Sequence, residues 1–221
     1  MKIFNKIKTN KRLTQQLTLK DQTGMTLIEL IVVLAIFAVL STVVVFDYGD
    51  FQSKIDIKNL ANDVALQVVQ AQSSALSGLR NSSASASWKP TYGVYFNPSG
   101  TTDSNGADNK DFIYFADLNN NNQFDGSAVG TGCTGDCLSK YTVTQNNYIS
   151  NITVYYTNGT NDPSPSNVTI TFTRPNSGAT IYDGVTNVTN TTSYVQVTVK
   201  NQKGNISSSI SLYPSGRIQI N

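Results

Sequence analysis

The residues best suited to binding chemistry lie in an asparagine-rich stretch. Asp117, Asn119 and Asn121 place side-chain oxygens at positions 1, 3 and 5 of a loop, and Asp125 follows at position 9. That spacing is typical of a calcium loop, in which carboxylate and amide oxygens coordinate the ion. Position 12, where such loops carry a glutamate, is Ala128, so the sequence predicts a weak calcium site. The alternative is an asparagine-rich turn whose side chains cap the backbone after a strand.

The two cysteines, Cys133 and Cys137, are separated by Thr-Gly-Asp. A redox-active pair needs two intervening residues rather than three. A zinc site needs more ligands, and the sequence contains no histidine to supply them. In a domain outside the cytoplasm the pair therefore predicts a disulfide that closes a small loop.

The absence of histidine also removes the commonest general base. No Ser-His or Cys-His couple exists, so we expect this chain not to be an enzyme. Serine and lysine are adjacent at Ser53-Lys54 and Ser139-Lys140. Neighbouring side chains point apart on a helix or strand, so both lysines are expected at the solvated surface. Trp88 and the tyrosines are expected to pack in the core and loops rather than to bind a ligand.

A single carboxylate, Glu29, interrupts the apolar run from residue 25 to residue 46. A helix of this length spans roughly 33 Å, enough to cross the hydrocarbon core of a membrane. A charge at bilayer depth costs roughly 2.5–3.5 kcal/mol on insertion scales, which favours a functional role for Glu29. The alternatives are a polar residue near the membrane interface and an ordinary signal anchor.

The segment before this run is basic. It carries six bases and one acid, so its charge is +5, whereas the whole chain is +2 and the remainder is 2 − 5 = −3. A basic flank favours a cytoplasmic N-terminus and an extracytoplasmic C-terminal domain. The acidic remainder gives no indication of nucleic-acid binding. A secretory signal would need cleavage near Ala38–Ser41, where no A-x-A site stands.

The basic leader, Gly24, the sequence Thr-Leu-Ile-Glu-Leu and the long apolar run together resemble the type IV prepilin signature. The resemblance implies that prepilin peptidase cuts between Gly24 and Met25 and methylates the new amine of Met25. Glu29 then stands at the fifth mature position. There it is expected to direct assembly with other pilin subunits by pairing with a neighbour's N-terminal ammonium.

The apolar run is expected to continue as an amphipathic helix that ends at Gly78 or Asn81, with a polar interruption at Asp47–Gly49. Its apolar positions recur every three or four residues: Ile57, Ala61, Val64, Val68, Ala71 and Ala75. Residues 82–87 are expected to form a loop. The segments that follow are rich in Val, Ile, Thr, Tyr and Phe, which favour β-strands. The predicted strands are Thr91–Phe96, Asp111–Ala116, Tyr141–Thr144, Ile149–Tyr156, Val168–Thr173, Tyr194–Lys200, Ile206–Leu212 and Arg217–Ile220. Turns are expected at Asn201–Gly204 and Pro214–Gly216.

Three further stretches, residues 70–75, 170–178 and 215–218, look like those of GspH/FimT-type minor pseudopilins. That resemblance implies an α+β fold, with a long N-terminal helix packed on a C-terminal antiparallel β domain. The expected parts are a cleaved leader (1–24), a membrane and assembly half of the helix (25–46), an amphipathic half (47–81) and a β-rich domain (88–221).

The implied function is that of a structural subunit, a minor pseudopilin or pilin, in a type II secretion or type IV pilus filament. Before assembly the chain is expected to cross the inner membrane once. The alternative is a signal-anchored extracytoplasmic binding module that keeps its leader.

Overall fold

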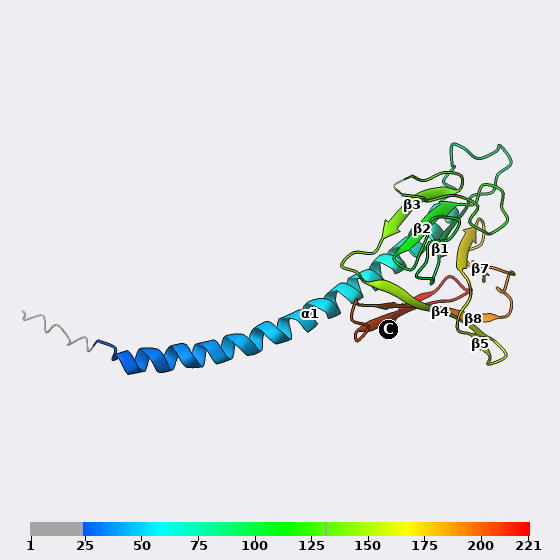
Figure 1. The fold of residues 1–221 in the computed structure, drawn as a ribbon. Coiled ribbons are helices and arrows are strands. Elements are labelled where there is room, and N and C mark those ends of the chain that lie inside the picture. The colour runs from blue at the N-terminus through cyan, green and yellow to red at the C-terminus, as the bar shows by residue number, and fades with distance from the viewer. Residues whose placement is uncertain (1–23, 131) are drawn as a thin grey trace, which may run out of the picture. The chain divides into compact units, whose positions relative to one another are not determined.

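The computed structural model describes residues 24–130 and 132–221, apart from the side chains of residues 45–47. Most of the predicted leader thus lies outside the described residues. The chain divides into two compact units, Met1–Phe46 and Asp47–Asn221. Helix α1 (Leu27–Leu76) begins in the first unit and ends in the second (Figure 1).

Helix α1 is continuous through Gly49, so the expectation of one long helix across the polar stretch Asp47–Gly49 is confirmed. One glycine costs about 1 kcal/mol relative to alanine, too little to break so long a helix. The helix ends as predicted at Gly78, which has φ +69°. Gly78 N–H donates to the Ala75 carbonyl at 3.0 Å, and Leu79 N–H donates to the Ser74 carbonyl at 3.1 Å. These two bonds form a Schellman motif, which satisfies the last helical carbonyls.

The second unit contains two antiparallel sheets (Figure 1). The first has the strand order β3-β2-β1-β6-β7 and the second has the order β10-β9-β8-β4-β5. The strands are β1 (Thr91–Phe96), β2 (Asp111–Ala116), β3 (Cys137–Thr142), β4 (Tyr148–Tyr156), β5 (Asn161–Asp162), β6 (Val168–Thr173), β7 (Ala179–Tyr182), β8 (Thr192–Lys200), β9 (Ser207–Leu212) and β10 (Ile218–Ile220).

The predicted bounds of β1, β2 and β6 are confirmed, whereas β3 begins four residues before the predicted strand. Both predicted turns are present. Gly204 N–H donates to the Asn201 carbonyl at 2.8 Å between β8 and β9, and Gly216 N–H donates to the Tyr213 carbonyl at 2.8 Å between β9 and β10. Strands β5 and β7 were not predicted, because each is short and lies among turn-forming residues.

The core of the second unit joins the C-terminal part of α1 to both sheets. The predicted apolar stripe is confirmed, because all six of its residues are buried. Four of them, Ala61, Val64, Ala71 and Ala75, have no exposed surface. Small side chains let the helix backbone approach the sheets closely. Polar contacts also reach the helix end, where the Tyr114 hydroxyl and Ser74 Oγ are 2.9 Å apart and the Tyr92 hydroxyl donates to the Leu79 carbonyl at 2.9 Å.

Each sheet has two outer strands, β3 and β7 in the first and β10 and β5 in the second. Three of the four are short, with four residues in β7, three in β10 and two in β5. The outer strand β3 has six residues, and its Lys140 side chain is paired with Asp111 on the adjacent strand β2 at 2.9 Å.

Candidate functional site

The N-terminal candidate site lies at the first turn of α1. Gly24, Met25 and Thr26 precede the helix and are exposed, as is Glu29 within the first turn. The Thr26 hydroxyl oxygen accepts the backbone N–H of Glu29 at 3.3 Å. Thr26 therefore caps the helix, with Glu29 at the third helical position as in a capping box. An acidic side chain at this end also interacts favourably with the helix dipole.

The helix that follows is long and apolar enough, by length and composition, to cross a membrane. None of the residues in its most apolar window is buried. Leu27, Phe37 and Val39 are all more than 60 % exposed. Burying so many large apolar side chains is favourable, so this part of α1 fits a helix surrounded by lipid or packed against other helices.

A family model described as the prokaryotic N-terminal methylation motif matches residues 19–45. The chain is type IV pilin-like in its N-terminal segment. The match covers Gly24, Met25 and Glu29 together, and it fits a pilin or pseudopilin that prepilin peptidase processes. The motif and the apolar helix also fit a membrane-anchored pilin. No curated protein and no solved structure matches the chain significantly.

The second candidate site is the asparagine-rich loop after β2. The Asp117 carboxylate accepts the backbone N–H groups of Asn121 at 3.2 Å and Asn122 at 2.7 Å. One carboxylate oxygen of Asp125 accepts the side-chain amides of Asn119 at 2.8 Å and Asn121 at 2.6 Å. The structure thus brings together all four residues proposed for calcium. The same contacts also fit the alternative reading, a turn in which side chains cap the backbone.

Asp136 is a member of this site that the sequence did not indicate. Its two carboxylate oxygens accept the backbone N–H groups of Leu118 and Asp125, each at 3.2 Å. Asp136 lies between the two cysteines, so it joins the cysteine loop to the asparagine-rich loop. Its only signal in the sequence was its place beside a glycine in the Thr-Gly-Asp turn.

Burial raises the pKa of both Asp117 and Asp136 above the ordinary aspartate value. Backbone N–H donors act in the opposite direction on each, because they stabilise the charged form. The charge of Asp136 further raises the pKa of Asp117, and the charge of Asp125 does the same to Asp136. The carboxylates of Asp117, Asp125 and Asp136 therefore influence one another across the two loops.

A cation would be the natural partner of such a group, but the donor set is incomplete. Within residues 24–130 and 132–221 no three acidic, histidine or cysteine side chains are grouped closely enough to hold a metal ion. Asn119 and Asn121 direct their side-chain oxygens at backbone N–H groups and their amide nitrogens at Asp125. Calcium coordination by Asn119 and Asn121 would require both side-chain amides to rotate, so the calcium site remains a prediction.

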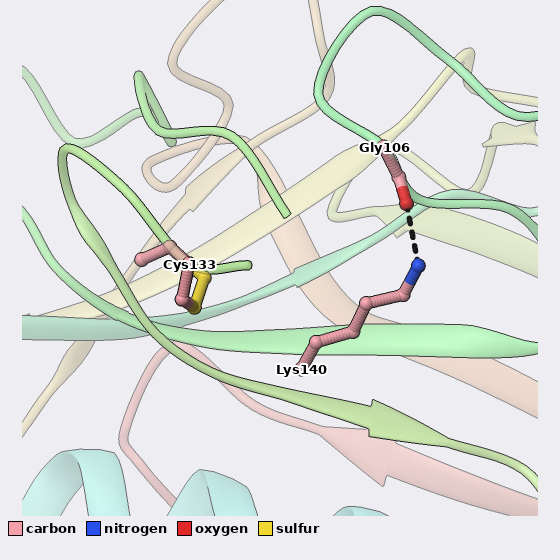
Figure 2. Close-up of a disulfide and its surroundings, with 4 residues drawn as sticks. Gly106, Cys133 and Lys140 are labelled. Atoms are coloured by element: carbon pink, nitrogen blue, oxygen red, sulfur yellow. Dashed lines mark hydrogen bonds between the residues drawn. A yellow bond between two sulfur atoms is a disulfide. The ribbon is translucent and has the colours of Figure 1, made fainter. Parts of the chain in front are cut away.

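The predicted disulfide between Cys133 and Cys137 is present (Figure 2). Gly135, with φ +66°, forms the turn that it closes. Cys137 is the first residue of β3 and belongs to a small apolar cluster with Phe115 and Phe124. The ring centroids of Phe124 and Phe115 lie 5.3 Å apart. Phe124 thereby anchors the asparagine-rich loop to this cluster.

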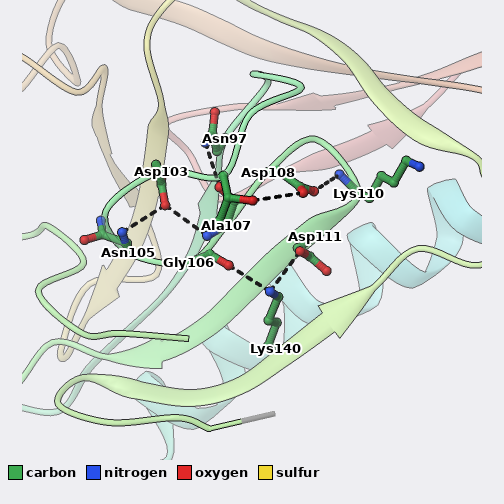
Figure 3. Close-up of polar contacts among 10 residues, drawn as sticks. Asn97, Asp103, Asn105, Gly106, Ala107, Asp108, Lys110, Asp111 and Lys140 are labelled. Carbon is green, nitrogen blue, oxygen red and sulfur yellow. Dashed lines mark hydrogen bonds and ion pairs between the residues drawn. The ribbon is translucent and has the colours of Figure 1, made fainter. Parts of the chain in front are cut away.

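Lys140 was predicted at the solvated surface, and this prediction is wrong. Its side chain is only 20 % exposed and its ammonium lies 2.9 Å from the Asp111 carboxylate. The same ammonium donates to the Gly106 carbonyl at 2.7 Å, which fastens the loop between β1 and β2 (Figures 2 and 3). Asp103 holds the same loop by accepting the N–H groups of Asn105 and Ala107, each at 2.9 Å. These residues therefore have a structural role.

Proposed function

We propose that this chain is a structural subunit of a type II secretion or type IV pilus filament, and specifically a minor pseudopilin or pilin rather than an enzyme. The observation that carries the proposal is the methylation motif, which covers Gly24 and Met25 just before α1, Glu29 in its first turn and an apolar helical segment with no buried residue. Prepilin peptidase would remove the basic leader and methylate Met25. The apolar helix would hold the subunit in the inner membrane until assembly.

Glu29 supplies the assembly chemistry in this proposal. In a bundle of apolar helices its carboxylate would pair with the Met25 ammonium of a neighbouring subunit. Breaking a buried ion pair by removing one partner costs about 3–5 kcal/mol, so only one helix register would be favoured. Thr26 supports this role, because its cap on the Glu29 N–H keeps Glu29 in the first helical turn.

The C-terminal part of α1 also favours helix packing. Outside its buried stripe it carries large apolar residues that are exposed, Leu66 (60 %), Val69 (46 %) and Leu76 (40 %). Their spacing of 3 and 7 residues places them on one helix face. A second apolar face on a helix that already covers the core is expected where subunits pack side by side.

The GspH/FimT type is supported by one contact set. The Gln72 side-chain amide donates to the carbonyls of Ser177 at 2.8 Å and Gly216 at 3.5 Å. The three stretches that carry the resemblance, residues 70–75, 170–178 and 215–218, thus meet at one place in the fold.

The deciding experiment is the intact mass and N-terminal sequence of the protein purified from membranes of its own host. A chain that starts at Met25 and is heavier by one methyl group supports the proposal. A chain that keeps its leader favours the alternative, an uncleaved signal-anchored binding module whose β domain holds a ligand. A start near Thr42 would indicate an ordinary secreted protein and would contradict both.

A further inference from the structure

A cavity of about 430 Å³ lies within the second unit, between α1 and the segment that leads out of β3. Its helical wall presents Asp56, Asn59, Asp63 and Gln67. These positions differ by three, four and four residues, so they form one ridge along the helix. The cavity lies apart from the asparagine-rich loop, the disulfide and the N-terminal motif.

One acceptor in this wall lacks a donor. Gln67 is only 8 % exposed, and its Oε1 atom is buried without a hydrogen-bond partner in the described part of the chain. Buried polar atoms are nearly always paired, so an unpaired one calls for an explanation such as a water, an ion or a binding partner. Rotation about the terminal torsion of glutamine exchanges the oxygen with the amide nitrogen and lets the oxygen meet a donor that enters the cavity.

The charge of the cavity points to a cation. Asp56 and Asp63 both line it, and no lysine or arginine is among its lining residues in the described chain. Asp56 already accepts the Gln52 amide at 2.9 Å, and it shares an adjoining hollow with Lys203. Asp63 is exposed, and its carboxylate makes no hydrogen bond or ion pair within residues 24–130 and 132–221. Asp63 is therefore the carboxylate available to an incoming charge.

The opposite wall favours a flat cation. Phe112 and Tyr141 line the cavity, and their rings stack with centroids 5.3 Å apart and planes 10° from parallel. A guanidinium group is planar, stacks on aromatic rings and carries five N–H donors. It would therefore match a carboxylate, an amide oxygen and an aromatic wall together. A metal ion fits poorly, because the two carboxylates stand two helical turns apart, roughly 10 Å.

We propose that this cavity receives an arginine side chain of a neighbouring filament subunit, with Asp63 and Gln67 as its acceptors. The neighbouring subunit as the source of the arginine rests on the proposed function. Recognition of a guanidinium group by the cavity does not depend on that function. A copy of this chain could supply the side chain, because Arg80, Arg174 and Arg217 are all exposed. Arginine is also enriched at protein interfaces.

The test uses the mature chain in detergent micelles, with N-acetyl-arginine amide as the probe. We expect saturable shifts of the Gln67 side-chain amide and of the Asn59 and Asp63 backbone amides in ¹⁵N-¹H spectra, with a dissociation constant in the millimolar range. The citrulline analogue, which is neutral but of nearly the same shape, should give none. The Asp63→Asn variant should bind at least about fivefold more weakly. Asp50→Asn, which removes an exposed charge from the same helix outside the cavity, should bind as the parent does.

Gln67→Met is the second variant, because it removes the unpaired oxygen while filling a similar volume. It should weaken arginine binding without lowering the melting temperature. The inference is overturned if the citrulline or lysine analogue produces the same shifts, or if no shift appears at about 100 mM probe.

The source is tested in the host. Asp63→Asn should be processed at Gly24 like the parent but be recovered less in sheared filaments. If the parent binds arginine and Asp63→Asn is nevertheless recovered in filaments as well as the parent, the assignment to a neighbouring subunit is overturned. Filaments without arginine binding would reject this inference and leave the proposed function standing. Arginine binding without processing or filaments would reject the proposed function.

Discussion

The side-chain amide of Gln72 donates to the carbonyl of Ser177 at 2.8 Å, across 105 residues of sequence. This bond ties the end of α1 to the loop that follows β6. Gln72→Leu should lower the free energy of unfolding by about 1 kcal/mol, because the Ser177 carbonyl loses its donor. Denaturant unfolding of the mature chain measures this. Gln70→Leu, at an exposed position two residues away, is the matched control, and equal losses in both variants would contradict the role of this bond.

Thr26 caps the helix through the Glu29 N–H. Thr26→Val keeps the side-chain shape but removes the acceptor, so the first turn should lose about 1 kcal/mol of local stability. Amide hydrogen exchange at Glu29 should become faster as a result. Thr26→Ser keeps the hydroxyl and should exchange like the parent. A Thr26→Val chain with unchanged exchange would show that the hydroxyl does not stabilise the turn.

Glu29→Ala should leave cleavage after Gly24 intact and block assembly, because the neighbour's Met25 ammonium would have no partner in an apolar surrounding. Mass spectrometry of the membrane fraction measures cleavage, and sheared filaments measure assembly. Glu29→Asp, which keeps the charge on a shorter side chain, should assemble better than Glu29→Ala. Normal filaments from Glu29→Ala would rule out the proposed pairing.

Calcium binding at the asparagine-rich loop, if the amides turn, should be weak, with a dissociation constant near the millimolar extreme for such sites. Isothermal titration of the mature chain with calcium chloride should then give heat that Asp125→Asn removes. Magnesium chloride at the same concentration controls for ionic strength. The absence of heat at millimolar calcium would leave the loop as a capped turn without a metal.

The buried carboxylate of Asp136 should make the folded chain less stable as the pH rises. Its pKa is raised above 3.8 in the folded state, mainly by burial, so between the two values the folded chain binds more protons than the unfolded chain. The stabilising contribution is complete below the unfolded pKa and is lost as the pH rises through the folded pKa. Relative to Asp136→Asn, the parent should therefore lose stability as the pH rises above about 4, the ordinary aspartate value, as thermal unfolding across a pH series will measure. A relative stability that rises with pH would contradict the raised pKa.

Much of the fold could be predicted from the sequence because its signals are local. Strands such as β1 and β6 are runs of β-branched and aromatic residues, and the cap at Gly78 needs only a glycine after an apolar repeat. The apolar residues at Leu66, Val69 and Leu76 were not recognised as a second face. The pattern did indicate the stripe that meets the sheets, because its small alanines suit close packing, whereas the second set of apolar residues is shorter and less regular.

The candidate sites also divide into residues that a local sequence signal identifies and residues that only the folded chain brings together. The N-terminal motif is continuous in sequence, so Gly24, Met25 and Glu29 could all be named in advance. Asp136 could not be named, because its partners at Leu118 and Asp125 lie on another loop. Lys140 was misplaced for a similar reason, since the Asp111 carboxylate that holds it comes from a neighbouring strand.

The outer strands of the two sheets bear on how the β domain avoids edge-to-edge aggregation. An unpaired strand edge is a template for cross-β growth. Edges of two, three and four residues offer few backbone groups to a second chain. On the longer edge strand β3, the Lys140 side chain is paired with Asp111 on β2, so any added strand would have to fit beside this lysine. These short or charged edges thus protect the domain against amyloid-like fibres.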